Sequence, residues 1–335
     1  MRLITVEEHY NDQRIVEANA AFEPERPAPP PHLAADIAFM KARSFPEEKL
    51  LDFEKYRLPF MDENGIDVQV LSYTFPFSDH VPAAEQVEGC RLANDISRAI
   101  LERYPGRFEA FATVPMADPV AAGEELRRCV EDLGMCGTLL AGRYKGRFFN
   151  EPEFFPIYEA ATQCGVPVSF HPAFIPREVQ DAYYMSDAYS FIVGSELACA
   201  GIGWHFETGM QAVRLIMSGT FDKLPELKII SGHWGEMIPA YLERVDERLD
   251  KELTGLERQF SEYYKDHVYL SSSGILSHDQ LGYMVKLMGA DHIMFSIDYP
   301  YILPSGSKEF LIEADLTDEE RELIAHGTAE KLLGI

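Results

Sequence analysis

Short apolar segments recur along the chain, and each is followed by a longer segment with helical periodicity. The apolar segments are rich in Val, Ile, Leu and Phe, which is typical of strands buried on both faces of a parallel sheet. This pattern predicts strands at residues 3–9, 68–74, 108–114, 136–142, 166–172, 227–233, 268–274 and 293–300.

The segments between these strands have apolar residues at spacings of three and four, as expected for helices with one buried face. Residues 85–106 and 121–134 are examples, and each ends at a glycine that suits a helix C-cap. The repeated strand and helix favour a (β/α)8 barrel, with a doubly wound parallel sheet as the alternative. No change in composition marks a boundary, so we expect a single domain over residues 1–335.

Two connections are too long for simple crossovers. Residues 10–67 contain the proline cluster "FEPERPAPPPH", which predicts a stiff, extended segment. Residues 173–226 have the pattern of additional helices rather than of a linker. Both connections follow predicted strands, so we expect them to lie over the C-terminal mouth of the barrel, above a site or against a neighbouring subunit.

Composition and charge exclude some classes of function. The chain is 46% hydrophobic, which indicates a globular protein. It has 55 acidic and 30 basic residues, and this net charge of −25 opposes nonspecific binding to nucleic acid or anionic membranes. No apolar run is long enough to span a membrane, no signal peptide is recognisable, and the five cysteines show no paired spacing. We therefore expect a cytoplasmic protein with reduced thiols.

Candidate chemistry lies at the ends of the predicted strands. The first strand ends in "VEEHY", where alternation places Glu7 and His9 on one face and Glu8 on the other. A carboxylate and an imidazole side by side suit a metal ion.

Three later strands also end in residues that bind metals or transfer protons, namely His171, His233 and Asp298. A single histidine on an apolar strand is more often a structural residue. Barrel enzymes gather their chemistry at the C-terminal ends of several strands, so this set predicts an active site.

The sequence resembles the metal-dependent amidohydrolase superfamily, in particular the branch that contains aminocarboxymuconate semialdehyde decarboxylase, γ-resorcylate decarboxylase and 5-carboxyvanillate decarboxylase. The similarity covers nearly the whole chain, through "VEEH", "MDENGIDVQVLS", "YPGRFEAFATVP", "GVPVSFHP", "RLIMSGTFDKLPELKIISGHWGEMIP" and "GADHIMFSIDYPY". A first strand with Glu-x-His resembles the benzoate-type decarboxylases, whereas His-x-His is usual in the semialdehyde decarboxylase and in many hydrolases.

The resemblance implies that one divalent metal ion is bound by four residues, Glu7, His9, His171 and Asp298. Two imidazoles and two carboxylates do not distinguish Mn²⁺ from Zn²⁺. The resemblance also implies that Glu236, in "HWGE", orients the catalytic His233 beside the metal. Alternatively, Glu236 only caps the first turn of the next helix.

Substrate-binding residues are also implied by the resemblance. Arg57 matches a position that often holds the substrate carboxylate, and Arg244 matches one that reaches an adjacent subunit's site, in a homodimer or homotetramer. Either arginine could instead be an ordinary solvated residue. The same loops contain aromatic residues that suit stacking on a flat substrate, although most aromatics serve packing: Tyr10, Phe75, Phe77, Trp234, Tyr299 and Tyr301.

The expected reaction is non-oxidative decarboxylation of a hydroxylated benzoate, a small aromatic carboxylate. Asp298 would protonate the ring carbon and Arg57 would orient the carboxylate. The alternative is hydrolysis of a lactone or amide by metal-activated water, with Asp298 or His233 as the base. A binding protein without activity would be expected to have lost some of the metal ligands. The segments "GTLLAGRYKGRF" and "YTFPFSDHVP" depart from the family pattern on loops that face the substrate.

Overall fold

The computed structural model describes residues 1–22, 33–44, 47–73 and 77–335. Its centre consists of parallel β-strands, and each of them overlaps one of the predicted apolar segments. The strands are β1 (Ile4–Tyr10), β2 (Val68–Tyr73), β3 (Phe108–Ala110), β4 (Thr138–Ala141), β5 (Val168–His171), β6 (Ile229–Ser231), β7 (Val268–Ser271) and β8 (Ile293–Met294).

Main-chain pairing joins these strands into a barrel. One sheet has the order β1-β2-β3 and the other has the order β4-β5-β6-β7-β8. Parallel bridges connect the two sheets at both seams, between Ala112 and Thr138 and between Glu8 and Tyr299. The predicted (β/α)8 barrel is confirmed, and the doubly wound sheet is excluded because such a sheet has two open edges.

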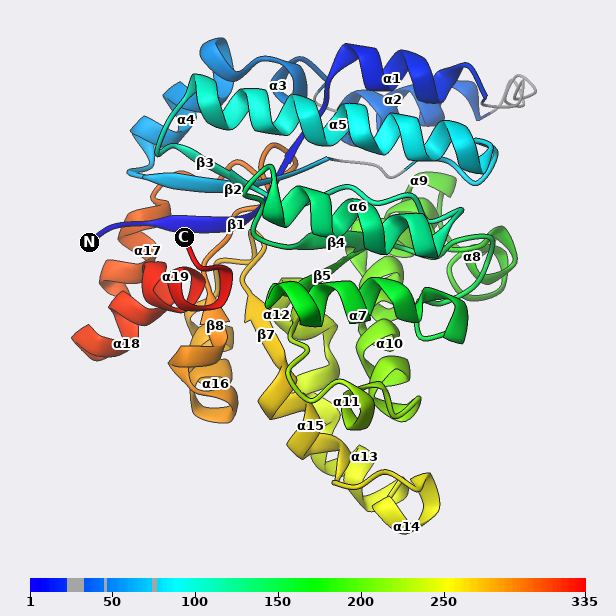
Figure 1. Cartoon of the computed structure of the whole chain (residues 1–335), viewed down its shortest axis with the longest axis vertical. Helices are drawn as coiled ribbons and strands as arrows, with labels where there is room; N and C mark the ends of the chain where they lie inside the picture. Colours follow the sequence, from blue (N-terminus) through cyan, green and yellow to red (C-terminus); the bar gives the residue numbers. More distant parts are fainter. Residues whose placement is uncertain (23–32, 45–46, 74–76) are drawn as a thin grey trace.

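Helices follow the strands and surround the barrel, and α5, α6 and α7 pack in a row along one flank (Figure 1). None of the described helices is both long and apolar enough to cross a membrane.

The α-helices, in chain order, are α1 (Gln13–Ala20), α2 (Ala34–Ser44), α3 (Glu47–Leu51), α4 (Leu58–Glu63), α5 (Ala83–Arg103), α6 (Pro119–Glu131), α7 (Phe155–Cys164), α8 (Arg177–Tyr183), α9 (Phe191–Glu196), α10 (Gly203–Met217), α11 (Thr220–Lys223), α12 (Gly232–Glu236), α13 (Leu242–Arg248), α14 (Lys251–Thr254), α15 (Phe260–His267), α16 (His278–Met288), α17 (Ser307–Glu313), α18 (Asp318–Glu322) and α19 (Thr328–Leu333).

The two long connections form additional helices. Residues 173–226 form α8 to α11, as predicted, and the described part of residues 10–67 forms α1 to α4. The proline cluster lies outside the described residues, apart from Phe22. Helix α2 contacts α9, so the two connections meet each other.

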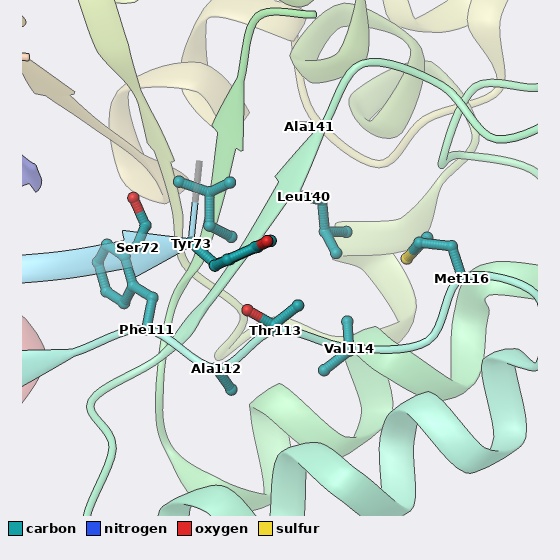
Figure 2. Close-up of a pocket in the computed structure, with 10 residues that line it drawn as sticks. Ser72, Tyr73, Phe111, Ala112, Thr113, Val114, Met116, Leu140 and Ala141 are labelled. Carbon is teal, nitrogen blue, oxygen red and sulfur yellow. The ribbon is translucent and has the colours of Figure 1, made fainter. Parts of the chain in front are cut away.

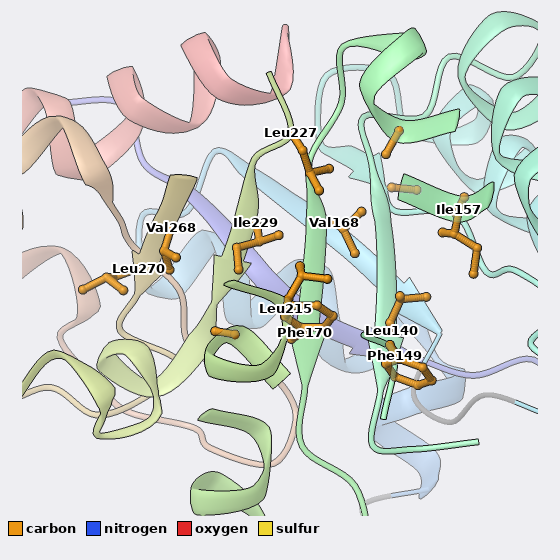
Figure 3. Packing of buried hydrophobic residues seen from close by; sticks show 14 of the residues in the cluster. Leu140, Phe149, Ile157, Val168, Phe170, Leu215, Leu227, Ile229, Val268 and Leu270 are labelled. Carbon is orange, nitrogen blue, oxygen red and sulfur yellow. The ribbon is translucent and has the colours of Figure 1, made fainter. Parts of the chain in front are cut away.

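Two apolar cores lie on either side of the barrel wall. Ile229 and Val268 belong to the outer core, which packs the strands against helices such as α7 and α10 (Figure 3). The next residue on β6, Ile230, belongs to a second core together with Val68 and Met294. Alternation along each strand therefore fills both the barrel interior and the layer beneath the helices.

Strand β1 has one extra residue relative to β2, between Thr5 and Glu8. This β-bulge changes the side of the sheet to which the following side chains point. Ile4, before the bulge, and Val6, within it, lie in the interior core, and Glu7, also within the bulge, points into the barrel mouth. Glu8 points the other way, as the sequence predicts.

The Glu8 carboxyl group lies at the seam between β1 and the chain after β8. It accepts hydrogen bonds from the backbone N–H groups of Ile297 (3.0 Å) and Tyr299 (3.1 Å), and from the Gln69 amide (3.3 Å). Complete burial raises the pKa of Glu8 to about 8, although these backbone hydrogen bonds oppose the shift. Glu8 therefore satisfies buried donors where the barrel closes.

We predict that Glu8→Ala lowers the free energy of unfolding by about 3 kcal/mol, because it leaves two buried N–H groups without an acceptor. Urea unfolding of the variant measures this change. The matched control is Glu88→Ala, on the exposed face of α5, which should leave the midpoint nearly unchanged. Equal midpoints for the two variants would contradict a role for Glu8 at the seam.

Candidate metal centre at the barrel mouth

Four side chains from three places in the barrel meet at its mouth. Glu7 and His9 come from β1, His171 ends β5, and Asp298 follows β8. One possible ligand atom from each lies within 4.8 Å of the others. His9 Nε2 is 3.2 Å from Asp298 Oδ1, and His171 Nε2 is 3.5 Å from Glu7 Oε1. The structure thus brings together the four residues that the sequence predicts as metal ligands.

The chemistry of this cluster fits one divalent cation. Imidazole nitrogen and carboxylate oxygen are suitable ligands for Mn²⁺ and Zn²⁺, and two ionised carboxylates would balance the charge of the ion. Within the described residues, Glu7 Oε1, His9 Nε2 and Asp298 Oδ1 are buried and form no hydrogen bond. Buried polar atoms are rarely left without a partner, so a cation between them would explain the arrangement.

Burial changes the pKa values in this cluster. Burial raises the pKa of Glu7, the His233 imidazole opposes the shift, and the Asp298 carboxylate adds to it. Burial also keeps the pKa of His171 well below its usual range, and neighbouring His9 lowers it further. His171 is therefore neutral and can offer a lone pair to a metal.

Hydroxyl groups hold two of the predicted ligands in place. Ser72 Oγ lies 2.9 Å from His9 Nδ1, which leaves Nε2 facing the cluster. Glu7 Oε2 accepts hydrogen bonds from Ser271 Oγ (3.2 Å) and from Ser273 Oγ. Glu7 therefore has only Oε1 free for a metal, and these contacts fix the orientation of both ligands.

The predicted pair of His233 and Glu236 is also brought together beside this cluster. His233 Nδ1 is 2.8 Å from Glu236 Oε1, and His233 Nε2 is 3.8 Å from Asp298 Oδ2. Burial alone would lower the pKa of His233, but the carboxylates of Glu236 and Glu7 outweigh it and raise the pKa well above its usual range.

Glu236 does not cap a helix, which was the alternative role. Residues 233–237 all have positive φ, between 47° and 77°, so α12 contains a left-handed turn. Both oxygens of the buried Glu236 carboxylate accept from imidazoles, those of His233 and His205. The Glu236 carboxylate therefore binds two histidines and not the N–H groups of a helix.

Sequence reasoning missed His205. Its Nδ1 lies 2.8 Å from Glu236 Oε2, and its ring centroid lies 4.4 Å from that of His233. His205 is on α10, within a long connection, and no strand end marks its position. The only sequence signal is a histidine in a helical segment predicted to lie over the mouth.

Arg57 and Tyr299, both predicted to bind substrate, pack behind β1. The fully buried Arg57 guanidinium donates to Gln69 Oε1 (2.9 Å) and to the His9 carbonyl, and it lies over the Phe53 and Tyr299 rings. Burial lowers the pKa of Arg57 to about 10 and raises that of Tyr299 to about 12. The structure does not bring either side chain to the metal cluster, so substrate binding by them stays a prediction.

Arg244 lies on α13, where its side chain is 60% exposed and pairs with Glu247 (3.1 Å). It does not reach the metal cluster of its own chain. Of the other predicted aromatics, Tyr301 has its ring centroid 5.6 Å from that of His9. Tyr10 and Phe77 belong to the outer core, Trp234 Nε1 donates to the Ile275 carbonyl (2.8 Å), and Phe75 lies outside the described residues.

A small cavity of about 20 Å³ lies beside the cluster, at the ends of β2, β3 and β4 (Figure 2). Ser72, which contacts His9, forms one wall, and Tyr73, Thr113 and Leu140 form others. This volume is enough for about one water molecule.

Comparison with known proteins identifies relatives over the whole length of the chain. The family model described as Amidohydrolase matches residues 32–335. γ-Resorcylate decarboxylase from Polaromonas sp. is 30% identical over 343 residues, covering 98% of this chain and 97% of that protein.

Two solved structures have the same fold. 5-Carboxyvanillate decarboxylase from Sphingomonas paucimobilis superposes with a TM-score of 0.86 and 29% identity, over 100% of this chain and 99% of the other. Dihydroxybenzoic acid decarboxylase from Polaromonas sp. JS666, solved with bound manganese and the inhibitor 2-nitroresorcinol, gives 0.82 and 27%, over 99% and 97%. The resemblance inferred from the sequence motifs is confirmed, and this chain belongs to the amidohydrolase family.

Proposed function

We propose that this protein is a metal-dependent decarboxylase that removes CO2, without oxidation, from a hydroxylated aromatic carboxylic acid. The observation that carries the proposal is the Glu-x-His pair of β1, which converges with His171 and Asp298 on one point. Relatives named as hydroxybenzoate-type decarboxylases cover almost the whole chain.

The metal would be held by Glu7, His9, His171 and Asp298. Manganese is bound in a relative of known structure, and zinc suits the same donor atoms. When bound, the cation supplies positive charge that favours the phenolate form of a substrate hydroxyl group.

Asp298 would transfer the proton that the reaction needs. Direct loss of CO2 from the ring would leave an unstable aryl anion, so protonation of the ring carbon comes first. The electron pair of the C–C bond then returns to the ring as CO2 leaves. Burial opposes ionisation of Asp298, but the imidazoles of His233 and His9 outweigh it and lower its pKa. Once protonated, Asp298 is therefore a strong acid.

His233 would return a proton to Asp298, since its Nε2 lies 3.8 Å from Asp298 Oδ2 and Glu236 holds its other nitrogen. Arg57 would act through the strand, because its guanidinium donates to the carbonyl of His9. Tyr299 would support Arg57, because the Arg57 guanidinium lies 4.4 Å from the centre of the Tyr299 ring.

Arg244 would complete the substrate site of a neighbouring copy in a homodimer or homotetramer. It is exposed on α13, and large apolar side chains nearby are also exposed, including Tyr241 (60%) and Leu253 (69%). An exposed arginine among apolar residues suits a protein interface.

The reaction class is tested by incubating the Mn²⁺-loaded protein in D2O with a panel of ortho-hydroxybenzoates. We expect CO2 release from at least one compound, with a single deuterium on the ring carbon that lost the carboxylate. Asp298→Asn should abolish both results. Lactone or amide turnover without CO2 release would instead support the hydrolase alternative.

The metal site is tested by metal content and by calorimetric titration of the metal-free protein with Mn²⁺. We expect Glu7→Ala to weaken Mn²⁺ binding at least about tenfold, because it removes an anionic ligand. His80→Ala removes an exposed histidine outside the cluster and should bind Mn²⁺ like the native protein. Native affinity in Glu7→Ala would refute this ligand set.

The role of Arg244 is tested by subunit complementation. Glu7→Ala and Arg244→Ala should each be nearly inactive, whereas a mixture after subunit exchange should regain about one quarter of native activity in a dimer. Half of the dimers are then mixed, and each mixed dimer has one intact site. A mixture as inactive as its components would contradict a shared site.

A further inference from the structure

We infer that His205 is a positioning residue, which holds Glu236 so that Glu236 in turn holds His233 in its working orientation. This inference rests on the proposed function and adds a residue to it. His205 belongs to α10, outside the strands that supply the predicted metal ligands, and it is not one of the four.

The hydrogen bonds of Glu236 give the first argument. Its side chain is completely buried, and its two oxygens lie 2.8 Å from His233 Nδ1 and 2.8 Å from His205 Nδ1. A carboxylate can only accept hydrogen bonds, so both Nδ1 atoms carry a proton. If His205 were absent, one buried oxygen would lose its partner and the carboxylate could rotate away from His233.

His205 is itself held at both ring nitrogens. With the proton on Nδ1, its Nε2 accepts a hydrogen bond from the indole N–H of Trp204 (3.1 Å). The side chain is only 14% exposed. A largely buried imidazole with contacts at both nitrogens has little freedom to turn, so it can fix the group that it binds.

The backbone of the turn gives an independent argument. Four non-glycine residues in the turn have left-handed φ values: His233 (47°), Trp234 (59°), Glu236 (53°) and Met237 (67°). Each such residue costs of order 1 kcal/mol or more, so surrounding contacts must hold the turn. Helix α10 approaches it so closely that a Cβ at Gly209 would lie 2.6 Å from the Glu236 carbonyl oxygen. The contact from His205 belongs to this same packing.

These contacts set the direction of His233. With Nδ1 bound to Glu236, its Nε2 faces Asp298 Oδ2 at 3.8 Å. A small rotation of Glu236 would move Nε2 away from Asp298, and proton transfer depends steeply on such distances. His205 should therefore affect the rate of turnover and leave the binding of substrate and metal unchanged.

The test compares His205→Leu with His205→Asn in the Mn²⁺-loaded protein. Leucine has no hydrogen-bond donor, whereas the asparagine amide can place one near the position of Nδ1. We expect His205→Leu to lower kcat about tenfold or more, with KM and Mn²⁺ affinity unchanged, and His205→Asn to stay within about threefold of the native kcat.

A matched control removes another histidine that bridges two glutamates. His326 lies 2.9 Å from Glu330 and 2.8 Å from Glu322, and Glu330 contacts Arg2, next to the start of β1 and so at the opposite end of the barrel from the metal cluster. His326→Leu should keep native kcat. An equal loss of kcat in His205→Leu and His205→Asn, or no loss in His205→Leu, would overturn the inference.

A second readout does not depend on activity. In metal-free protein labelled with ¹⁵N-histidine, we expect a slowly exchanging Nδ1–H signal for His233 in the native protein and in His205→Asn, and loss of this signal in His205→Leu. An identical His233 signal in all three proteins would overturn the inference. If no substrate released CO2, the proposed function would fail, and the spectra would still decide whether His205 holds the pair.

Discussion

The closure of the barrel between β1 and β8 is the constraint on which the site depends. Glu7 and Asp298 come from opposite ends of the chain, and the backbone N–H of Asp298 donates to the Glu7 carbonyl (3.0 Å). One face of this seam presents Glu7 and His9 to the predicted metal site. The other face contains Glu8 and Arg57, both fully buried. The predicted metal ligands Glu7 and His9 and the supporting Glu8 are thus consecutive residues of one strand.

The four predicted metal ligands of this acidic protein form a cluster of concentrated negative charge. Glu7 is buried and Asp298 is only 13% exposed, and they lie within a few ångströms of each other, which is unfavourable for two ionised carboxylates. The serine hydroxyls on Glu7 and the histidines around Asp298 reduce this cost without removing it. A divalent cation would remove most of this cost, so the burial of the two carboxylates favours metal binding.

The sequence was sufficient for the barrel and the metal cluster, because strand alternation and parallel topology together determine where strand-end residues lie. Glu7, His9, His171 and Asp298 each end or follow a buried strand, so their meeting follows from the fold. The placement of Arg57 could not be derived in this way, because it depends on how η1 (Phe53–Arg57) packs behind β1. His205 was missed because helix rotation and packing within a long connection leave no periodic signal that points to Glu236.

The bulge in β1 divides this strand into two parts that can change separately. Ile4 and Val6 lie in the interior core, whereas Glu7 and His9 face the predicted metal site and Glu8 faces the supporting side. Because the extra residue breaks the alternation of side chains, the direction of the side chains in the second part does not depend on that in the first part. A family built on this strand can therefore exchange one pair of ligands at positions i and i+2 for another, and alter its chemistry while the interior packing stays the same.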